Sequence, residues 1–180
     1  MFDVDYTKVI PVEDLGLDPK QVSKCSPSTT KYLFPILDYM KFNKNLKILD
    51  IGSGKGFVIK FFKQLGYRRV NGLEISRKLY KISINNFKKD IIKTKIYNID
   101  ACNYKFYKNH DIFYLYNPFP KKIAARVFSN IKSQIEIFNK RFYVIYANPV
   151  AHKILIKNGF VFEKNFPYIG GNKIAVYFYN

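Results

Sequence analysis

A glycine-rich turn between two short apolar stretches constrains this chain more than any other feature. Residues 48–51 form an apolar run that leads into Gly-Ser-Gly-Lys-Gly at 52–56, and a second run, Leu-Glu-Ile, follows at 73–75. Glycines let the backbone approach a ligand closely, and the helix after such a turn presents unpaired N–H groups. An acid at the end of the second strand, here Glu74, can accept hydrogen bonds from both hydroxyls of a ribose. The pattern therefore predicts a strand–turn–helix–strand unit that holds an adenosine-containing cofactor.

The spacing of the glycines narrows the choice of cofactor. A dinucleotide fold prefers G-x-G-x-x-G, and a phosphate-binding P-loop needs Ser or Thr after its Lys, whereas Lys55 is followed by Gly56. Asp50 stands two residues before the first glycine, where a carboxylate disfavours a pyrophosphate and suits a cation. S-adenosylmethionine carries an ammonium and a sulfonium and no phosphate, so the sequence favours it over a nicotinamide cofactor and disfavours an oxidoreductase.

These residues resemble the glycine turn of class I S-adenosylmethionine-dependent methyltransferases. More narrowly, the chain is similar to a largely uncharacterised bacterial group of that class. The group shares an N-terminal Phe-Asp with a Pro-Leu-Glu-Asp-Leu-like segment, an Asp-x-Gly-Ser-Gly-Lys-Gly turn, and a fourth strand that ends in Tyr-Leu-Tyr/Phe-Asn-Pro-Phe. The matching residues here are 2–3, 9–15, 50–56 and 114–119, together with 146–150 after the fifth strand.

The resemblance implies a set of cofactor contacts. They are Asp50, Gly52, Ser53, Gly54, Gly56, Glu74, Ile75, Asp100, Ala101 and Asn117. Asp50 would attract the ammonium, Glu74 would hold the ribose, and Asp100 would accept from the adenine amino group. For Asp100, a plain cap of a helix or turn remains an alternative.

The segment Asn117-Pro118-Phe119 is the candidate for catalysis. An Asn oxygen can accept a hydrogen bond from an amine and so direct the amine's lone pair at a methyl group. The segment is similar to the Asn-Pro-Pro-Tyr/Phe motif of amino-group methyltransferases, but one Pro is missing and the aromatic residue comes one position early. A rigid turn that closes the strand is the alternative interpretation. The residues expected to bind the acceptor are Pro118, Phe119, Tyr32 and Asn148.

Along the rest of the chain, short apolar runs alternate with stretches whose apolar residues recur at helical spacing. This alternation predicts strands and helices in turn. Strands are expected at 46–51, 70–75, 95–99, 111–116, 141–146, 161–166 and 173–179. Helices are expected at 28–42 with Ser28 as cap, at 57–65, from Ser76 to Ile91, at 121–138 and at 149–159. This order predicts an α/β fold: a Rossmann-like, doubly wound sheet of about seven strands, five parallel plus a C-terminal antiparallel hairpin, with helices on both faces. Residues 1–27 are expected to be a lead-in and 28–180 a single methyltransferase domain.

Composition limits the remaining possibilities. The chain has 180 residues, 48% of them hydrophobic, which suits one packed domain. No apolar run approaches the ~20 residues that span a bilayer, and the cysteines have no metal-ligand spacing. We expect a cytoplasmic protein in which Cys25 and Cys102 are free thiols, and in which His110 and His152 are surface residues without a catalytic role.

The net charge of +18 raises a second hypothesis. A basic surface favours an anionic partner, so the protein could be an RNA-binding or anionic-polymer-binding protein on a methyltransferase scaffold, without turnover. Most of the basic residues are Lys rather than Arg, which also fits AT-rich coding. If the protein is a methyltransferase, nitrogen on a protein side chain, an RNA base or a small amine is the expected acceptor, and an oxygen acceptor stays open as the alternative, although the sequence offers no evident general base for a hydroxyl. We expect its recognition to fall to residues 1–30 and the loops after the fourth and fifth strands.

Overall fold

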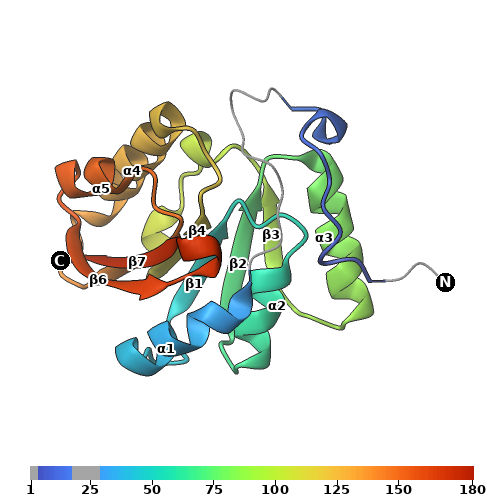
Figure 1. Ribbon diagram of the computed structural model, residues 1–180, viewed down its shortest axis with the longest axis horizontal. Coiled ribbons are helices and arrows are strands. Elements are labelled where there is room, and N and C mark those ends of the chain that lie inside the picture. The colour runs from blue at the N-terminus through green and yellow to red at the C-terminus, as the bar shows by residue number, and fades with distance from the viewer. Residues whose placement is uncertain (1–3, 18–28) are drawn as a thin grey trace.

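One seven-stranded sheet organises the computed structural model, which describes residues 4–17 and 29–180 (Figure 1). Its strands are β1 (Lys47–Ile51), β2 (Arg69–Glu74), β3 (Lys95–Asn98), β4 (Ile112–Tyr116), β5 (Phe142–Ala147), β6 (Val161–Pro167) and β7 (Lys173–Tyr179). The strand order is β3-β2-β1-β4-β5-β7-β6, with β1 to β5 parallel and β7 antiparallel to both β5 and β6. The predicted sheet of five parallel strands and a terminal hairpin is confirmed.

Helices cover both faces of the sheet. They are α1 (Phe34–Met40), α2 (Phe57–Gln64), α3 (Arg77–Lys89), α4 (Lys121–Ile135) and α5 (His152–Lys157). In β1, Ile48 packs on the side of α1 to α3, whereas Leu49 and Ile51 pack on the side of α4 and α5. Because both faces are buried, the parallel strands read as nearly continuous apolar runs rather than as alternating ones.

Helix bounds differ from the prediction. α1 covers only Phe34–Met40, whereas a helix was expected to extend to residue 42, and residues 30–33 form a 3₁₀ turn. α4 ends at Ile135, not at residue 138, and Phe138 is 37% exposed. α3 ends at Lys89, so Ile91 lies beyond it with a φ of 57° and an exposure of 84%. α5 begins at His152 rather than at residue 149. For α3 and α4, the helical spacing of apolar residues continues past the last residue that packs against the sheet.

Caps explain two of the boundaries. Ser76 caps α3 as predicted, since its Oγ accepts a hydrogen bond from the backbone N–H of Leu79. α2 ends just before Gly66, whose φ of 88° suits the left-handed residue that follows a helix. The expected Ser28 cap lies outside the described residues, which begin again at 29 with a short 3₁₀ turn and α1.

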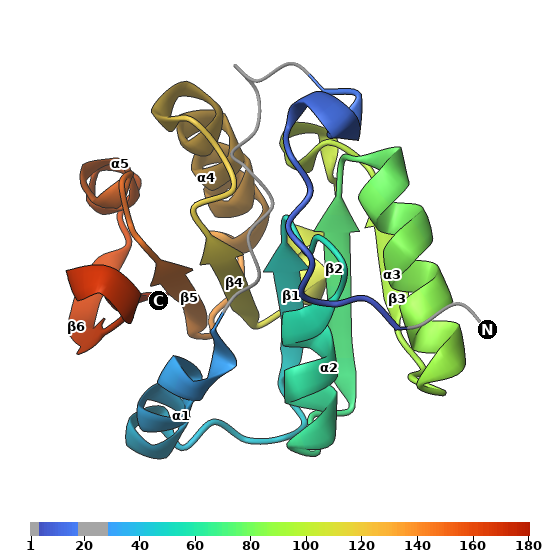
Figure 2. The ribbon, with the colours of Figure 1, turned by 45° about the vertical axis from the view of Figure 1, so that its right-hand side comes forward.

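Residues 4–17, which we call the N-terminal strap, pack against α3 instead of extending away from the domain. Ile10 and Leu15 form a small apolar cluster with Leu79 of α3. Figure 2 shows the strap running along the α3 side to the carboxyl ends of β1 and β2. The strand order reverses between β1 and β4, so their carboxyl ends open a crevice there, as is usual for ligand sites in such sheets.

In the described part of the chain, no helix is long and apolar enough to cross a membrane. No group of three or more His, Cys, Asp or Glu side chains within residues 4–17 and 29–180 is arranged to hold a metal ion. Cys102 is a free thiol, as expected, and Cys25 lies outside the described residues.

Candidate functional site

A cavity of about 280 Å³ lies at the carboxyl ends of β1, β2 and β4. It brings together most of the residues that the sequence predicts to bind the cofactor or the acceptor. Those that line it are Asp50, Gly52, Ser53, Gly54, Glu74, Ile75, Asp100, Ala101, Asn117, Pro118, Phe119 and Asn148. Gly56 and Tyr32 are the two nominated residues that do not line it.

The glycine turn comes very close to the loop after β4. A Cβ on Gly52 would lie 2.7 Å from the Cβ of Pro118, and Gly52 has a φ of 79°. The N–H groups of Gly52 and Ser53 both donate to the carbonyl of Leu73, at 2.9 Å each. Only glycine fits a backbone of this conformation so close to Pro118. The glycine turn and the loop after β4 can therefore meet at the cavity wall.

Gly56 serves a different purpose. A Cβ at Gly56 would lie 2.1 Å from the ring of Phe87 on α3, and its φ is 89°. The third glycine of the motif therefore lets α2 and α3 pack together, and it stands behind the cavity rather than in its wall.

Two buried carboxylates face the cavity. Asp50 is 3% exposed and Glu74 is 5% exposed. Glu74 accepts hydrogen bonds from the N–H of Gly54 at 2.8 Å and of Ser76 at 2.7 Å. Burial raises the pKa of Asp50 well above its ordinary value, and the charge of Glu74 adds to the rise. Burial also raises the pKa of Glu74, against its hydrogen bonds from Ser76, Gly54 and Ile75. Such a pair favours a cationic ligand, because a cation restores the charged forms.

Asp100 both lines the cavity and caps a turn, so its position is compatible with either interpretation that the sequence left open. It lines the cavity, and its Oδ1 also accepts a hydrogen bond from the N–H of Cys102 at 2.8 Å, which caps a 3₁₀ turn at Ala101–Asn103. The cap fixes the carboxylate beside Ala101, which is buried against the cavity. A carboxylate held in this way leaves further lone pairs for a ligand.

Asn117 has an unsatisfied acceptor. Its Oδ1 is buried and has no hydrogen-bond partner among the described residues, and its φ is 38°. A buried acceptor without a donor costs about 1–3 kcal/mol, and a non-glycine residue with positive φ is strained. The unsatisfied oxygen and the strained backbone of Asn117 both lie next to Pro118 and Phe119, which also line the cavity.

Tyr32 is connected to the cavity only through other aromatic rings. Its ring packs against Tyr168 with centroids 5.2 Å apart, and Tyr168 packs against Tyr116 at 5.4 Å. Tyr116, the last residue of β4, does line the cavity. Tyr32 therefore supports the wall from behind, and sequence reasoning missed Tyr116 because an aromatic at a strand end has no distinctive pattern.

The N-terminal strap supplies a wall that the sequence did not reveal. Tyr6, Lys8, Leu15 and Leu17 line the cavity. Lys55 of the glycine turn, which also lines the cavity, is 4% exposed and contacts the strap. Its ammonium forms an ion pair with Asp5 and donates to the carbonyl of Lys8 at 2.7 Å.

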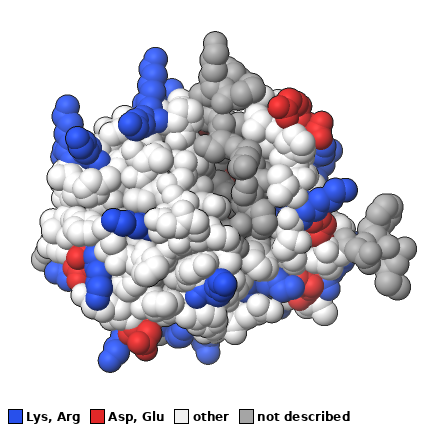
Figure 3. Space-filling view, in the orientation of Figure 1, with Lys and Arg blue, Asp and Glu red and all other residues white. Residues whose placement is uncertain are grey.

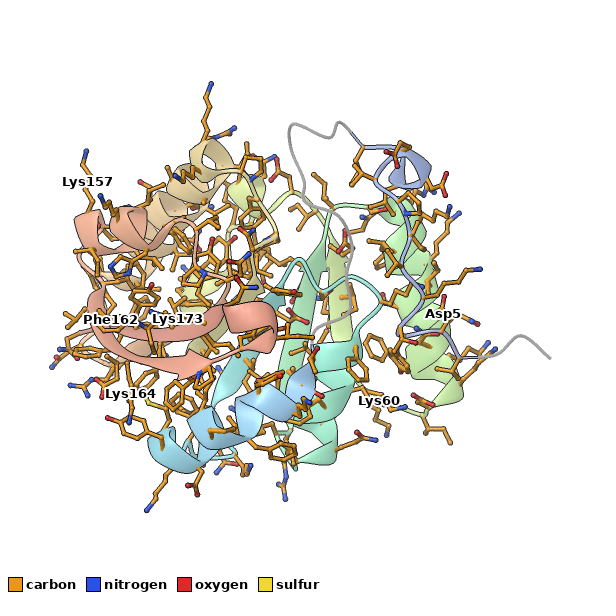
Figure 4. The ribbon with its side chains drawn as sticks, in the orientation of Figure 1. Asp5, Lys60, Lys157, Phe162, Lys164 and Lys173 are labelled. Carbon is orange, nitrogen blue, oxygen red and sulfur yellow. The ribbon has the colours of Figure 1, made fainter. Side chains whose placement is uncertain are left out.

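Other contacts hold the strap on α2 and α3. The Asn86 side-chain amide donates to the carbonyls of Asp5, at 2.8 Å, and Lys55, at 3.2 Å. The Tyr6 hydroxyl donates to Asp90 at 2.7 Å, and Lys60 pairs with the same carboxylate at 2.8 Å. Figure 4 labels Asp5 and Lys60 on this side of the molecule. No local signal predicts the partners of the strap, because its contacts with Lys55, Asn86 and Asp90 join residues 47 to 84 positions apart.

The two histidines lie outside the cavity. His110 is 2% exposed, so the expectation of a surface residue was wrong for it. Its Nδ1 lies 3.1 Å from the carbonyl of Phe106, and its Nε2 lies 3.3 Å from the Asn71 amide nitrogen. His152 is exposed, as expected, and its Nδ1 lies 2.8 Å from the Tyr177 hydroxyl.

Basic side chains are spread over the face that Figure 3 draws. Lys and Arg appear around much of its outline, and acidic side chains gather at the upper right. Near the cavity, Lys121 and Lys122 are exposed on the first turn of α4, and Arg126 of the same helix lines the cavity. The cavity mouth therefore has a basic side along α4.

Comparison with known proteins connects this geometry to a family. A family model described as ribosomal RNA adenine dimethylase matches residues 28–165. None of the curated proteins compared with the chain matches it. Among solved structures, a protein of Pyrococcus horikoshii OT3 has a TM-score of 0.66 at 16% identity, over 82% of this chain and 88% of that one. Magnesium protoporphyrin IX methyltransferase of Synechocystis PCC 6803, with S-adenosylmethionine bound, has a TM-score of 0.62 at 16% identity, over 83% and 77%. Similarity at this identity establishes the fold.

Proposed function

This chain belongs to the ribosomal RNA adenine dimethylase family, and from that premise we propose that it methylates the amino nitrogen of an adenine in RNA. The general reaction follows from the family: the protein is an S-adenosylmethionine-dependent methyltransferase. The RNA base is the finer step. It is one of the three nitrogen acceptors that the sequence left open, and the family description favours it over a protein side chain or a small amine.

The unpartnered Oδ1 of Asn117 is the observation that carries the proposal. An amine is a hydrogen-bond donor, so it satisfies a buried oxygen that otherwise has no partner. The oxygen lies in the wall that also contains Asp50 and Glu74. The acceptor and the cofactor would therefore share one cavity, which methyl transfer requires.

The proposed roles of the residues follow from their surroundings. Asp50 and Glu74 hold the ammonium and the ribose of S-adenosylmethionine, and Asp100 with Ala101 and Ile75 contacts its adenine. When bound, this cofactor supplies a methyl group on a positively charged sulfur. Asn117 accepts a hydrogen bond from the acceptor amine, which keeps the nitrogen lone pair aimed into the cavity, while Phe119 offers an apolar face to a planar base. The amine nitrogen would gain the methyl carbon as the carbon–sulfur bond breaks, leaving the electron pair on the sulfur, which becomes the neutral thioether of S-adenosylhomocysteine, and the amine would release a proton to solvent.

Charge supports an RNA acceptor over a small amine. The net charge of +18 and the basic side of the mouth along α4 favour a polyanion, and phosphate contacts usually position a nucleic acid on its protein. Binding without turnover stays the second hypothesis, since the same charge motivates it. The narrower resemblance to the bacterial group with a Tyr-Leu-Tyr/Phe-Asn-Pro-Phe strand also belongs to this proposal.

A labelled methyl donor tests the acceptor class. Unmodified ribosomal RNA, a protein extract and a mixture of small amines are incubated separately with the protein and S-adenosylmethionine labelled in its methyl group. We expect label in RNA, removed by ribonuclease and unaffected by protease. Label in the protein extract or the amines alone would overturn the RNA assignment, and salt-sensitive RNA binding without label would favour the second hypothesis.

Matched variants separate chemistry from folding. Asn117→Ala is expected to lose transfer and to weaken cofactor binding less than Glu74→Ala does, because its oxygen acts on the acceptor although the residue also stands among the expected cofactor contacts. Asn45→Ala changes an exposed Asn before β1, at the opposite end of the sheet, and is expected to retain both. Equal activity of Asn117→Ala and the wild type would contradict the catalytic role.

A further inference from the structure

Two asparagines leave the sheet side by side, and each is followed by a proline. Asn117-Pro118 follows β4, and Asn148-Pro149 follows β5. The strands are parallel neighbours whose last residues, Tyr116 and Ala147, are paired in register. Adjacent strands lie about 4.8 Å apart, so the two asparagines begin their loops at the same level.

Both asparagines have an unusual backbone. Their φ angles are 38° and 50°, in the left-handed region that non-glycine residues seldom adopt. A following proline restricts the preceding residue further toward extended conformations. Asn tolerates positive φ better than most residues, so tolerance alone would explain the residue type. It would not explain why both strained residues line one cavity, because strain of this kind tends to gather at functional sites.

The backbone N–H and carbonyl of Asn148 both have hydrogen-bond partners within the protein. Its N–H donates to the carbonyl of Lys173 at 2.9 Å, and its own carbonyl accepts from the N–H of Val150 at 2.8 Å. These bonds tie the loop to β7 and fix the position of the residue. Asn148 is half-buried in the cavity wall, so its carboxamide is the polar group that it can offer to a ligand.

We propose that Asn148 is a second acceptor-recognising residue that works beside Asn117. Resting on the proposed function, the inference assigns two adjacent polar atoms of the base to two adjacent amides. Asn117 accepts from the exocyclic amine, and the Asn148 amide donates to the ring nitrogen next to that amine. Adenine offers an amine donor beside a ring-nitrogen acceptor on either side, whereas uracil and guanine present a carbonyl acceptor where adenine has its amine. The pair would therefore select against the keto bases.

Glycine separates recognition from backbone tolerance. Asn148→Gly keeps the positive φ without strain and removes the carboxamide, while Asn148→Asp keeps the size and removes the donor. A purely structural Asn predicts that the glycine variant binds RNA as the wild type does. Lys41→Gly is the matched control, since Lys41 also has a positive φ, 47°, but caps α1 away from the cavity.

The experiment measures RNA binding rather than the rate of methyl transfer, once methyl transfer by the wild type has identified the RNA. The shortest ribosomal RNA fragment that accepts methyl groups is bound to protein saturated with S-adenosylhomocysteine, and affinity is followed by fluorescence anisotropy. The target adenosine is replaced by 1-deazaadenosine or by 7-deazaadenosine, each of which lacks one ring nitrogen beside the amine. For the wild type and Lys41→Gly, we expect one replacement to weaken binding about tenfold. For Asn148→Gly, we expect neither replacement to matter, with cofactor affinity and melting temperature close to those of the wild type.

Each result is decisive. If the deazaadenosine replacements weaken RNA binding equally in the wild type and in Asn148→Gly, or weaken it in neither, the role of Asn148 alone would be overturned. Failure of the wild type to methylate any RNA would overturn the proposed function and this inference with it.

Discussion

The carboxylate of Glu74 accepts a hydrogen bond from the backbone N–H of Gly54 at 2.8 Å. One acid at the end of β2 thus holds the glycine turn that follows β1, and its other oxygen accepts from Ser76 at the start of α3. The residue that would bind the ribose is also the residue that shapes the turn. Binding and local folding are consequently coupled at this position.

Replacing Glu74 should therefore affect both cofactor binding and stability. Glu74→Ala removes the acceptor of two backbone N–H groups and the proposed ribose contact, and hydrogen bonds to charged groups contribute about 1.5–3 kcal/mol each. We expect S-adenosylmethionine affinity to fall at least about tenfold by calorimetric titration, with a lower melting temperature. Glu136→Ala, at an exposed position after α4, should change neither. Unchanged affinity in Glu74→Ala would refute the ribose assignment.

Asp50 should make cofactor binding depend on pH. Burial and the Glu74 charge raise its folded-state pKa above the ordinary value of 3.8. Its contribution to the stability of the ligand-free protein is therefore complete below 3.8 and is lost as pH rises through the raised pKa. A cation needs the ionised carboxylate, so affinity should rise over the same interval.

Asp50→Asn keeps the shape and removes the titration. We expect it to raise the melting temperature of the ligand-free protein at neutral pH, to weaken S-adenosylmethionine binding, and to flatten the pH dependence of affinity. Titrations at several pH values, with melting curves of both proteins, provide the check. A variant that retains the pH dependence of the wild type would assign it to another group.

The strap should loosen when its buried lysine loses its charge. Lys55→Met keeps the apolar stem but removes the ammonium that pairs with Asp5 and donates to the carbonyl of Lys8. We expect faster protease cleavage within residues 4–17, and weaker cofactor binding because the strap lines the cavity. Lys60→Met removes a more exposed ion pair with Asp90 and should have a smaller effect. Equal cleavage of the wild type and Lys55→Met would contradict the anchoring role.

His110 should limit stability in acid. Burial lowers its pKa from 6.5 to about 4. The unfolded chain thus binds a proton that the folded chain does not, so the contribution of His110 is complete above pH 6.5 and is lost as pH falls toward about 4. The loss is on the order of 3 kcal/mol. Denaturant unfolding at several pH values should show this slope in the wild type and a reduced slope in His110→Asn, with His152→Asn as the exposed control.

The sequence predicted the sheet because the relevant signals are local. Apolar runs, the glycine turn and the capping Ser76 each lie within a few residues of the element they define, and the strand bounds agree with the structure to within one or two residues. The helix ends were less predictable. Residues such as Phe138 and Ile91 continue the apolar spacing, but they extend beyond the surface that the sheet can bury.

In the candidate site, too, some residues were predictable from local sequence and others were not. Asp50, Gly52 and Glu74 were identified because their spacing is typical of a cofactor turn, whereas the strap depends on partners far away in the sequence, such as Asp5 with Lys55 and Asn86. Gly56 matched the motif, but its surroundings give it a packing role against Phe87. Spacing identifies a turn, and only the three-dimensional contacts separate the glycines that line the cavity from those that pack against a neighbouring helix.

Mass spectrometry of the nucleosides in ribosomal RNA tests the central claim most directly. Unmodified RNA, free and in ribosomal subunits, is incubated with S-adenosylmethionine and either the wild type or Asn117→Ala, then digested to nucleosides. The account predicts adenosine that carries one or two methyl groups on its amino nitrogen with the wild type, and none with Asn117→Ala. Unmethylated adenosine after incubation with folded wild-type protein that binds the cofactor would contradict it.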